Sequence, residues 1–366
     1  MSSDNAGARL PSLDGWRAIS IALVIGGHSA SADGFPPEWK TAFAWIFNGE
    51  LGVRTFFVIS GLLITWLMLR EQARTGRVNL KHFYARRALR ILPVYFAFLT
   101  VVAALQWLTP FRQSAGQWLA NLTFTTGLLS WGGGGSWTTG HLWSLAVEEQ
   151  FYIIWPVVFA GFALASLWRR ALILLCIPIV LAPFCRAMAK SGLAPENLDF
   201  LLSPYTFATN FDAIALGCAG AILLFHRRED VQRALTSKAA LVMSAALAAI
   251  LTPYIMRGFL FGAVFTVPFG NTLQALGVTV LVLQSVLMPS FGFYRMLNWS
   301  AVAWVGVLSY SLYIWQQLFC SQPQWFGWNQ VWWMGWPGWI LATFASATTS
   351  YYFLEKPFMR LRAKLR

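Results

Sequence analysis

Charged residues are scarce in this chain of 366 residues: they make up 11% of it, whereas hydrophobic residues make up 57%. A soluble globular protein carries about 25% charged residues, so this composition excludes a surface built for water. Acidic residues are the scarcer kind, 14 against 27 basic ones, which gives a formal net charge of +13. The chain is rich instead in aromatic residues, with 20 tryptophans and 29 phenylalanines, as is typical of proteins with aromatic belts at two membrane interfaces. We therefore predict a polytopic membrane protein.

Cysteine is rare, and recognisable metal motifs are lacking. The four cysteines have no CxxC spacing, and the sequence has no HxxxH or HExxH pattern. This excludes the disulfide framework of a small secreted domain and predicts that the cysteines are small apolar packing residues. We expect no fixed metal. A GxSxG elbow, typical of serine hydrolases, is also absent from the sequence.

Long apolar segments take the place of charge. Each is long enough to cross a hydrocarbon core of roughly 30 Å as a helix. The ten predicted spans cover residues 14–31, 50–69, 88–108, 143–165, 171–189, 203–225, 238–256, 267–288, 301–320 and 336–356. Residues 117–130 are interpreted as a short interfacial or re-entrant piece. We predict an all-α bundle of about ten transmembrane helices, forming a single domain over residues 1–366, in the cytoplasmic (inner) membrane.

The basic residues fall mostly on one predicted face of this bundle. The connection over residues 70–90 is the richest, and both chain ends add to it with residues such as Arg9, Lys364 and Arg366. Basic connections lie on the cytoplasmic side, so we predict that both termini are cytoplasmic. The positive charge is then a consequence of topology, and we expect the lipid bilayer, and no nucleic acid, as a partner.

The first span contains two ionisable residues that are costly in hydrocarbon, Arg17 and His28, in the stretch "LDGWRAISIALVIGGHSASA". In a helix, His28 lies roughly 16 Å beyond Arg17, toward the outer leaflet. Arg17 can extend its charge back to the cytoplasmic interface. An ionisable residue within a span points to function by default, with a satisfied core histidine as the alternative for His28.

Other polar side chains are predicted at the same outer depth. Ser60 begins a Ser-Gly pair in the second span, where a small residue for close helix packing is the alternative interpretation. Ser144, Glu148 and Tyr152 repeat every four residues in the fourth span and share one helical face, while Glu149 points about 100° away. An interfacial pair of glutamates is the alternative there.

These residues predict general-base chemistry. A carboxylate beside an imidazole fixes its tautomer and stabilises its cation, and such a base can deprotonate a hydroxyl for attack on an acyl carbonyl. We predict His28, Glu148, Ser60 and Ser144 as catalytic candidates. Glu148 is the expected partner of His28. The secondary candidates on the fourth span are Trp143, Glu149 and Tyr152.

A basic cluster opens the third span in "FYARRALRILPVYF". Arg86, Arg87 and Arg90 lie at i, i+1 and i+4 of a helix that enters the membrane. Ordinary cytoplasmic anchoring is one interpretation. The other is a phosphate-binding site, for which guanidinium groups are well suited, and Arg17 is predicted at the same depth.

Together these segments resemble the acyltransferase-3 family of integral membrane O-acyltransferases, over nearly the whole chain. The resembling motifs are "RAISIALVIGGH", "FFVISGLL", "RRALRILPVY", "LWSLAVEEQFYIIWP", "FDAIALGCAGA" and "YFLEKPF". The chain departs from the family at one position: a histidine often follows "SYSLYxW", and Gln316 stands there instead.

The resemblance implies a ten-helix bundle that moves an acyl group, usually acetyl, from cytoplasmic acyl-CoA to a hydroxyl of an envelope or exported carbohydrate or glycolipid. It implies acetyl-CoA as donor substrate with no tightly bound cofactor. His28 would be the catalytic histidine, acting as a general base or as a transient acyl carrier, with Ser60 a weaker choice of carrier. Arg17 would be its motif partner, and Arg86, Arg87 and Arg90 would contact the CoA phosphates.

Two other classes of protein fit a membrane bundle with buried ionisable residues. A proton-coupled secondary transporter should show two similar halves with helices broken at corresponding positions, and the sequence has no such repeat. A glycan export protein would use the polar residues only to bind sugar. Neither alternative needs CoA. The sequence favours no particular acceptor or oligomeric state.

Overall fold

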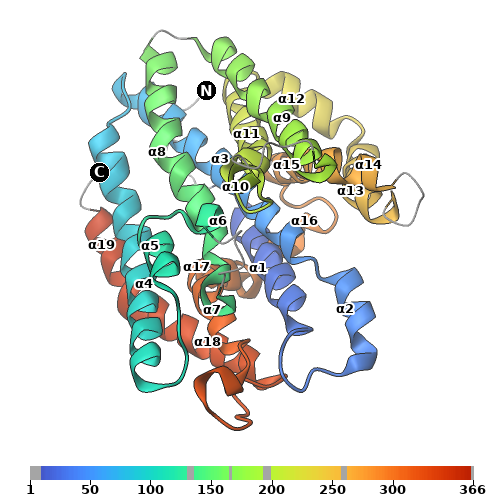
Figure 1. Ribbon diagram of the computed structural model, residues 1–366. Helices are drawn as coiled ribbons and strands as arrows, with labels where there is room; N and C mark the ends of the chain where they lie inside the picture. The colour runs from blue at the N-terminus through green and yellow to red at the C-terminus, as the bar shows by residue number, and fades with distance from the viewer. Residues whose placement is uncertain (1–9, 130–135, 165–166, 193–198, 257–261, 364–366) are drawn as a thin grey trace. The chain divides into compact units, whose positions relative to one another are not determined.

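The computed structural model describes residues 10–129, 136–164, 167–192, 199–256 and 262–363. Over these residues the regular structure is helical, apart from an isolated β-bridge between Asp33 and Gly335 (Figure 1). The predicted all-α class is confirmed. Arg9, Lys364 and Arg366, which we placed on the cytoplasmic face, lie outside the described residues.

Each predicted span coincides with a helix. These helices are α1 (Leu13–Ser29), α3 (Gly49–Thr75), α4 (Leu80–Leu108), α8 (Leu142–Leu164), α9 (Trp168–Ser191), α11 (Phe207–His226), α13 (Ala239–Met256), α15 (Asn271–Leu287), α17 (Ser300–Phe319) and α18 (Gly338–Ser350). Two spans also contain a π-helix: η5 (Thr266–Gly270) leads into α15, and η7 (Tyr351–Glu355) follows α18.

Seven helical segments among the described residues are long and apolar enough to cross a membrane. They are Pro37–Thr75, Leu80–Leu108, Trp137–Phe162, Trp168–Ser191, Phe200–His226, Ala239–Met256 and Thr266–Leu287. Of the other predicted spans, α1 has 17 residues and α18 has 13, fewer than the roughly 20 that a helix needs to cross the hydrocarbon core. The count of ten spans and the cytoplasmic side of both termini stay predictions.

The basic connection over residues 70–90 is mostly helical. α3 continues to Thr75 and α4 begins at Leu80, because arginine, glutamate and glutamine favour helix as well as apolar residues do. Gly76 follows α3 with a φ of 76°, in the left-handed region where helices often end. Asn79 caps α4 by accepting a hydrogen bond from the backbone N–H of His82 at 3.0 Å.

The chain divides into two compact units that alternate along the sequence. The first unit consists of Met1–Ala18, Val53–Val78 and Val147–Gly306, and the second consists of Ile19–Gly52, Asn79–Ala146 and Val307–Arg366. The boundaries fall within α1, α3, α8 and α17. The expectation of a single domain stays a prediction.

In the first unit, α9, α11, α13 and α15 pack against one another. Its short helices are α10 (Asp199–Leu202), α12 (Arg228–Thr236), α14 (Gly262–Phe265) and α16 (Tyr294–Leu297). α3 and α11 approach so closely that a Cβ atom on Gly61 would lie 2.1 Å from the carbonyl oxygen of Ile214. A Cβ on Gly217 would lie 2.1 Å from the carbonyl oxygen of Val58. The backbones of the two helices are therefore in contact, as small residues permit in membrane proteins.

A buried ion pair joins α9 to α11 in the same unit. Arg186 Nη2 lies 2.9 Å from Asp212 Oδ2, and both side chains are almost fully buried. Arg186 also donates to the backbone carbonyls of Pro268 and Thr209, and Thr272 bonds both Arg186 and Asp212. All three guanidinium nitrogens donate hydrogen bonds, which offsets the cost of removing the charges from water.

In the second unit, α4 lies beside α19 (Lys356–Ala363) (Figure 1). Glu355, the last residue of η7, is buried and accepts a hydrogen bond from Ser311 of α17 at 3.0 Å. The predicted interfacial piece contains α5 (Ala115–Leu122) and α6 (Thr126–Leu129), and Tyr95 of α4 donates to the Asn121 carbonyl at 2.7 Å. The other short elements are η2 (Pro37–Trp39), α2 (Lys40–Ile46), α7 (Trp137–Gly140) and η6 (Pro323–Phe326).

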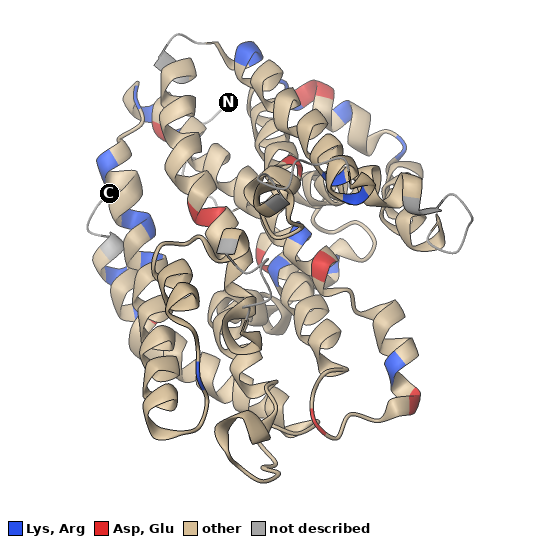
Figure 2. Ribbon diagram, viewed as in Figure 1, with Lys and Arg blue, Asp and Glu red and all other residues tan. Residues whose placement is uncertain are grey.

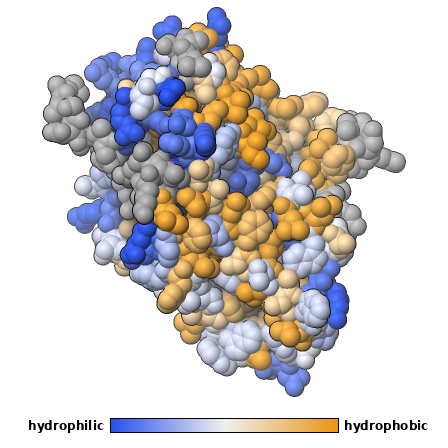
Figure 3. Space-filling view, turned by 90° about the vertical axis from the view of Figure 1, so that its left-hand side faces the viewer, coloured by the Kyte–Doolittle hydropathy of each residue, from blue (hydrophilic) through white to orange (hydrophobic). Residues whose placement is uncertain are grey.

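The exposed surface is rich in large apolar side chains. Figure 3 shows orange, apolar surface spread over much of one face of the molecule. On α9 the exposed apolar side chains are Ile173, Ile177, Val180, Leu181 and Phe184. Contiguous apolar surface of this extent fits contact with lipid and not with water.

Candidate functional site

His28 lies in the last turn of α1 and is half-buried. Its Nδ1 atom lies 2.9 Å from Oε1 of Gln316 on α17. The indole ring of Trp137 meets the imidazole edge-on, with 5.6 Å between the centroids. An amide oxygen can only accept, so Nδ1 carries the hydrogen in this bond. In the neutral ring, Nε2 is then unprotonated and can accept a proton.

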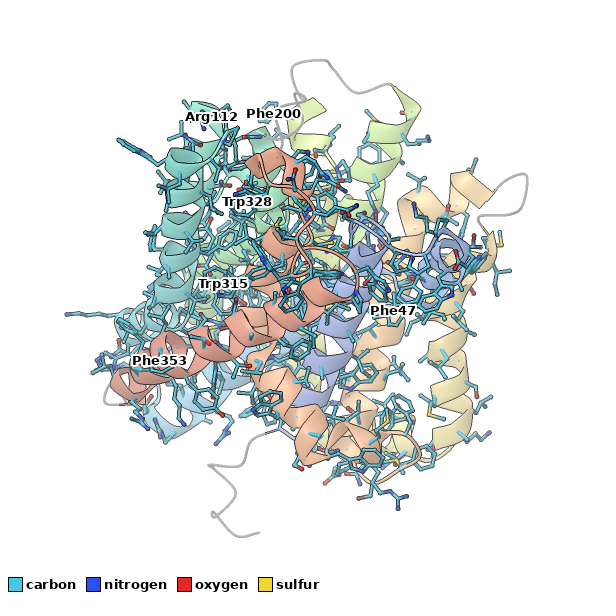
Figure 4. All side chains as sticks on the ribbon, turned by 90° about the horizontal axis from the view of Figure 1, so that it is seen from below. Phe47, Arg112, Phe200, Trp315, Trp328 and Phe353 are labelled. Carbon is cyan, nitrogen blue, oxygen red and sulfur yellow. The ribbon has the colours of Figure 1, made fainter. Side chains whose placement is uncertain are left out.

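Two glycines allow the chain to fold closely around this turn of α1. A Cβ atom on Gly26 would lie 2.2 Å from the Cγ atom of Phe47, which is labelled in Figure 4. A Cβ on Gly27 would lie 2.8 Å from the backbone nitrogen of Gly49. The "GGH" sequence thus combines a functional side chain with the only residue type that fits the two preceding positions.

Gln316 is fully buried, and its two amide atoms differ in their contacts. Oε1 bonds His28, whereas Nε2 has no hydrogen-bond partner among the residues that the structure describes. Leaving a buried donor unpaired costs about 1–3 kcal/mol. The neighbouring Trp315, labelled in Figure 4, packs edge-on against Phe98 of α4 at 5.6 Å between centroids, which helps to fix this part of α17.

A second buried histidine, His141, lies just before α8 in the same unit and was not among our predicted residues. Its backbone N–H donates to Gln317 Oε1, and its Nε2 atom lies 3.0 Å from the carbonyl oxygen of Ile314. Its own carbonyl accepts from Tyr313 at 3.0 Å and from Ser144 at 3.3 Å. The hydroxyls of Ser144 and Tyr313 are 2.5 Å apart. Ser144 therefore belongs to a network that joins α8 to α17.

Ser60 and Glu148 meet in the first unit. The Ser60 hydroxyl donates to Glu148 Oε1 at 2.7 Å, and the Tyr152 hydroxyl donates to Glu148 Oε2 at 3.3 Å. All of the red on α8 in Figure 2 belongs to Glu148 and the neighbouring Glu149, since no other acidic residue occurs on this helix. The predicted convergence of Ser60 with the Glu148–Tyr152 face is thus observed, and α8 is continuous through it.

The structure groups the predicted catalytic residues in two sets. His28 and Ser144 belong to the second unit, while Ser60 and Glu148 belong to the first. The pairing of His28 with Glu148 stays a prediction, and so do the roles of the half-buried Trp143 and Glu149. Gln316 was noticed in the sequence only as a departure from the family pattern. That departure was the one available signal for the partner that the structure gives to His28.

The arginine cluster lies in the first turns of α4. Arg86, Arg87 and Arg90 are all half-buried. Figure 2 shows blue on the N-terminal part of α4 and none on the rest of that helix. Arg17, in the first unit, lies 3.5 Å from Asp14 one turn earlier in α1. The arrangement permits phosphate binding by the α4 arginines, and that role stays a prediction for all four residues.

Comparison with known proteins places this geometry in context. The family described as "Acyltransferase domain" matches residues 10–355, nearly the whole chain. The chain belongs to this acyltransferase-3 family. Membership favours acyl transfer over the transporter and export alternatives.

Several curated relatives are similar over most of the chain. A putative peptidoglycan O-acetyltransferase of Bacillus subtilis, YrhL, is 29% identical over 95% of this chain and 54% of its own length. The peptidoglycan O-acetyltransferase OatA of Listeria monocytogenes is 26% identical over 95% of this chain and 55% of its own length. The O-acetyltransferase OatA of Staphylococcus aureus is 25% identical over 84% of this chain. The chain spans about half the length of these relatives. No solved structure matches it significantly.

Proposed function

We propose that this protein is a membrane O-acyltransferase that moves an acetyl group from cytoplasmic acetyl-CoA to a hydroxyl of an envelope carbohydrate. The observation that carries the proposal is the His28–Gln316 pair, which holds the Nδ1–H tautomer and leaves Nε2 of His28 available as a base. The names of the relatives support a cell-wall glycan as acceptor.

His28 acts as the general base in this proposal. Its Nε2 atom accepts the proton of the acceptor hydroxyl, whose oxygen attacks the thioester carbonyl of acetyl-CoA. The new C–O ester bond forms, the C–S bond breaks, and the CoA sulfur leaves with the proton that His28 held. The direct transfer needs no acyl-enzyme. Attack by Nε2 itself, with a transient acetyl-imidazole, is the alternative route.

The α4 arginines supply the donor site in this proposal. CoA carries several phosphate groups, and Arg86, Arg87 and Arg90 place three guanidinium groups within about one and a half turns of one helix. Their half-buried position lets their stems pack against the helix surface while their charged ends reach the aqueous side.

The proposal is tested by ester analysis of envelope glycans from cells that produce the wild-type protein or His28→Ala. NMR and mass spectrometry should detect an O-acetyl ester with the wild type and at most a residual amount with the variant. Removing a general base slows a reaction by roughly 10²–10⁴-fold.

A matched control is His226→Ala, since His226 is an exposed histidine that stacks on Trp168 in the first unit. It should leave the ester content unchanged, and all three proteins are compared at equal membrane abundance. Equal acetylation with wild type and His28→Ala would contradict the role of His28.

A further inference from the structure

Gln316 carries one polar atom that the proposed chemistry has not yet used. Its Nε2 amide nitrogen is a buried donor without a partner among the described residues, although its Oε1 is firmly occupied by His28. Buried donors in native proteins nearly always have partners, and the exceptions call for an explanation such as a ligand.

The position of this donor is fixed by its own carbonyl. The oxygen and nitrogen of one amide group are roughly 2.3 Å apart, so the bond from His28 to Oε1 holds Nε2 beside the imidazole. The packing of Trp315 against Phe98 and the full burial of Gln316 further restrict the amide. A donor held in place before the substrate arrives needs no reorganisation during the reaction.

We propose that the Nε2–H group of Gln316 is the hydrogen-bond donor for the thioester carbonyl oxygen of the acyl donor. The inference rests on the proposed function. When the acceptor oxygen attacks, the carbonyl π electrons move onto that oxygen, and the amide N–H stabilises the negative charge. When the carbonyl re-forms, the C–S bond breaks and the sulfur takes its proton from Nε2 of His28.

One side chain thereby serves both halves of the reaction. Its Oε1 holds the tautomer of His28, and its Nε2–H stabilises the oxyanion. An amide does not ionise near neutral pH, so this donor stays a donor whether His28 is neutral or protonated. A histidine at the same position would instead have to divide its two ring nitrogens between donor and acceptor roles as it titrates.

The two roles of Gln316 are separated by two substitutions of similar size. Gln316→Glu keeps an oxygen that accepts from His28 Nδ1 and removes the amide donor, whereas Gln316→Met removes both. The assay uses the purified full chain in nanodiscs, which leave both faces open to solution, with acetyl-CoA and a GlcNAc–MurNAc disaccharide as probes. Release of CoA thiol and formation of the disaccharide ester are both measured.

An oxyanion donor predicts that Gln316→Glu loses roughly 10²–10³-fold in kcat, with a change of KM for acetyl-CoA of less than about threefold, because the ground-state carbonyl gains less from the donor. Gln316→Met should lose at least as much. The matched control is Gln317→Glu, the same change one residue along α17, which retains the oxygen that accepts from His141. It should keep its kcat within about threefold of wild type.

The outcomes distinguish this inference from the proposed function. If Gln316 only orients His28, the carboxylate of Gln316→Glu replaces it fully, and kcat near or above wild type overturns the donor role alone. A loss in Gln316→Glu matched by an equal loss in Gln317→Glu overturns it as well. Absence of thiol release by the wild type, or undiminished turnover in His28→Ala, overturns the proposed function and this inference with it.

Discussion

Two buried polar pairs, one in each compact unit, differ in how completely their hydrogen bonds are made. In the first unit, Arg186 and Asp212 bond each other, and their remaining groups bond Thr272 and two backbone carbonyls. In the second unit, the His28–Gln316 pair makes one hydrogen bond and leaves the Gln316 amide nitrogen open.

The difference separates the structural from the chemical use of polar groups among apolar helices. A closed network has no atom left for a ligand, and its value lies in fixing helices against one another. An open pair is less favourable for folding, and its unused atom is available to a substrate. We therefore expect substitutions in the first pair to lower stability and substitutions in the second to lower turnover.

The largest effect on stability is expected from Arg186→Met. Removing one member of a buried ion pair leaves the other charged and buried, which costs about 3–5 kcal/mol. The thermal midpoint in detergent, followed by size-exclusion with fluorescence detection, should fall sharply together with the yield of folded protein.

The double variant Arg186→Met with Asp212→Leu tests the same pair from the other side. Replacing both charges by apolar groups is often nearly neutral, so the double variant should recover much of the lost stability. A single variant that melts like wild type would show that the closed network does not hold these helices together.

A smaller loss is expected from Thr272→Val, which keeps the shape of the side chain and removes its hydroxyl. The hydrogen bond to the Asp212 carboxylate should be worth about 1.5–3 kcal/mol. The same thermal measurement applies, and Thr252→Val is the control, since Thr252 is exposed and bonds only the backbone carbonyl of Ala248 among the described residues. Equal midpoints for the two variants would contradict the special place of Thr272.

The smallest effect on stability is expected from Gln316→Met. The substitution gives up one hydrogen bond to His28 and removes one unpaired buried donor, and these effects oppose each other within about 1 kcal/mol. Its thermal midpoint should stay close to that of wild type while its turnover is lost. A midpoint as low as that of Arg186→Met would erase the distinction between the two pairs.

The helices could be predicted from the sequence because a long apolar run determines its own helix with little help from the rest of the chain. The ends of those helices were less accessible. The connection over residues 70–90 looked like a loop since it is charged, yet only the short stretch from Gly76 to Asn79 interrupts the helices. The short helix α2 gave no signal, because a Trp- and Phe-containing segment of seven residues is too brief for a periodic pattern.

The candidate site was predicted in its residue types and only partly in its pairings. Ser60 and Glu148 could be paired because both were expected at one depth, and the helical face that carries Glu148 was readable from its spacing. The partner of His28 lies 288 positions along the chain, and a neutral glutamine gave no electrostatic reason to choose it over a glutamate. His141 escaped notice since a histidine among "TTGHLW" has no periodic or charged context.

The π-helix η7 has a consequence for how the end of this chain can change. A π-turn holds one residue more than an α-turn, so the five residues Tyr351–Glu355 advance the helix by one position relative to regular α geometry. Deleting one of them would restore the α register and rotate everything that follows by about 100°. The side chains of α19 would then turn away from α4, although no residue of α19 itself had been altered. Single-residue insertions and deletions here therefore act as a rotation of the terminal helix, whereas substitutions leave its facing unchanged.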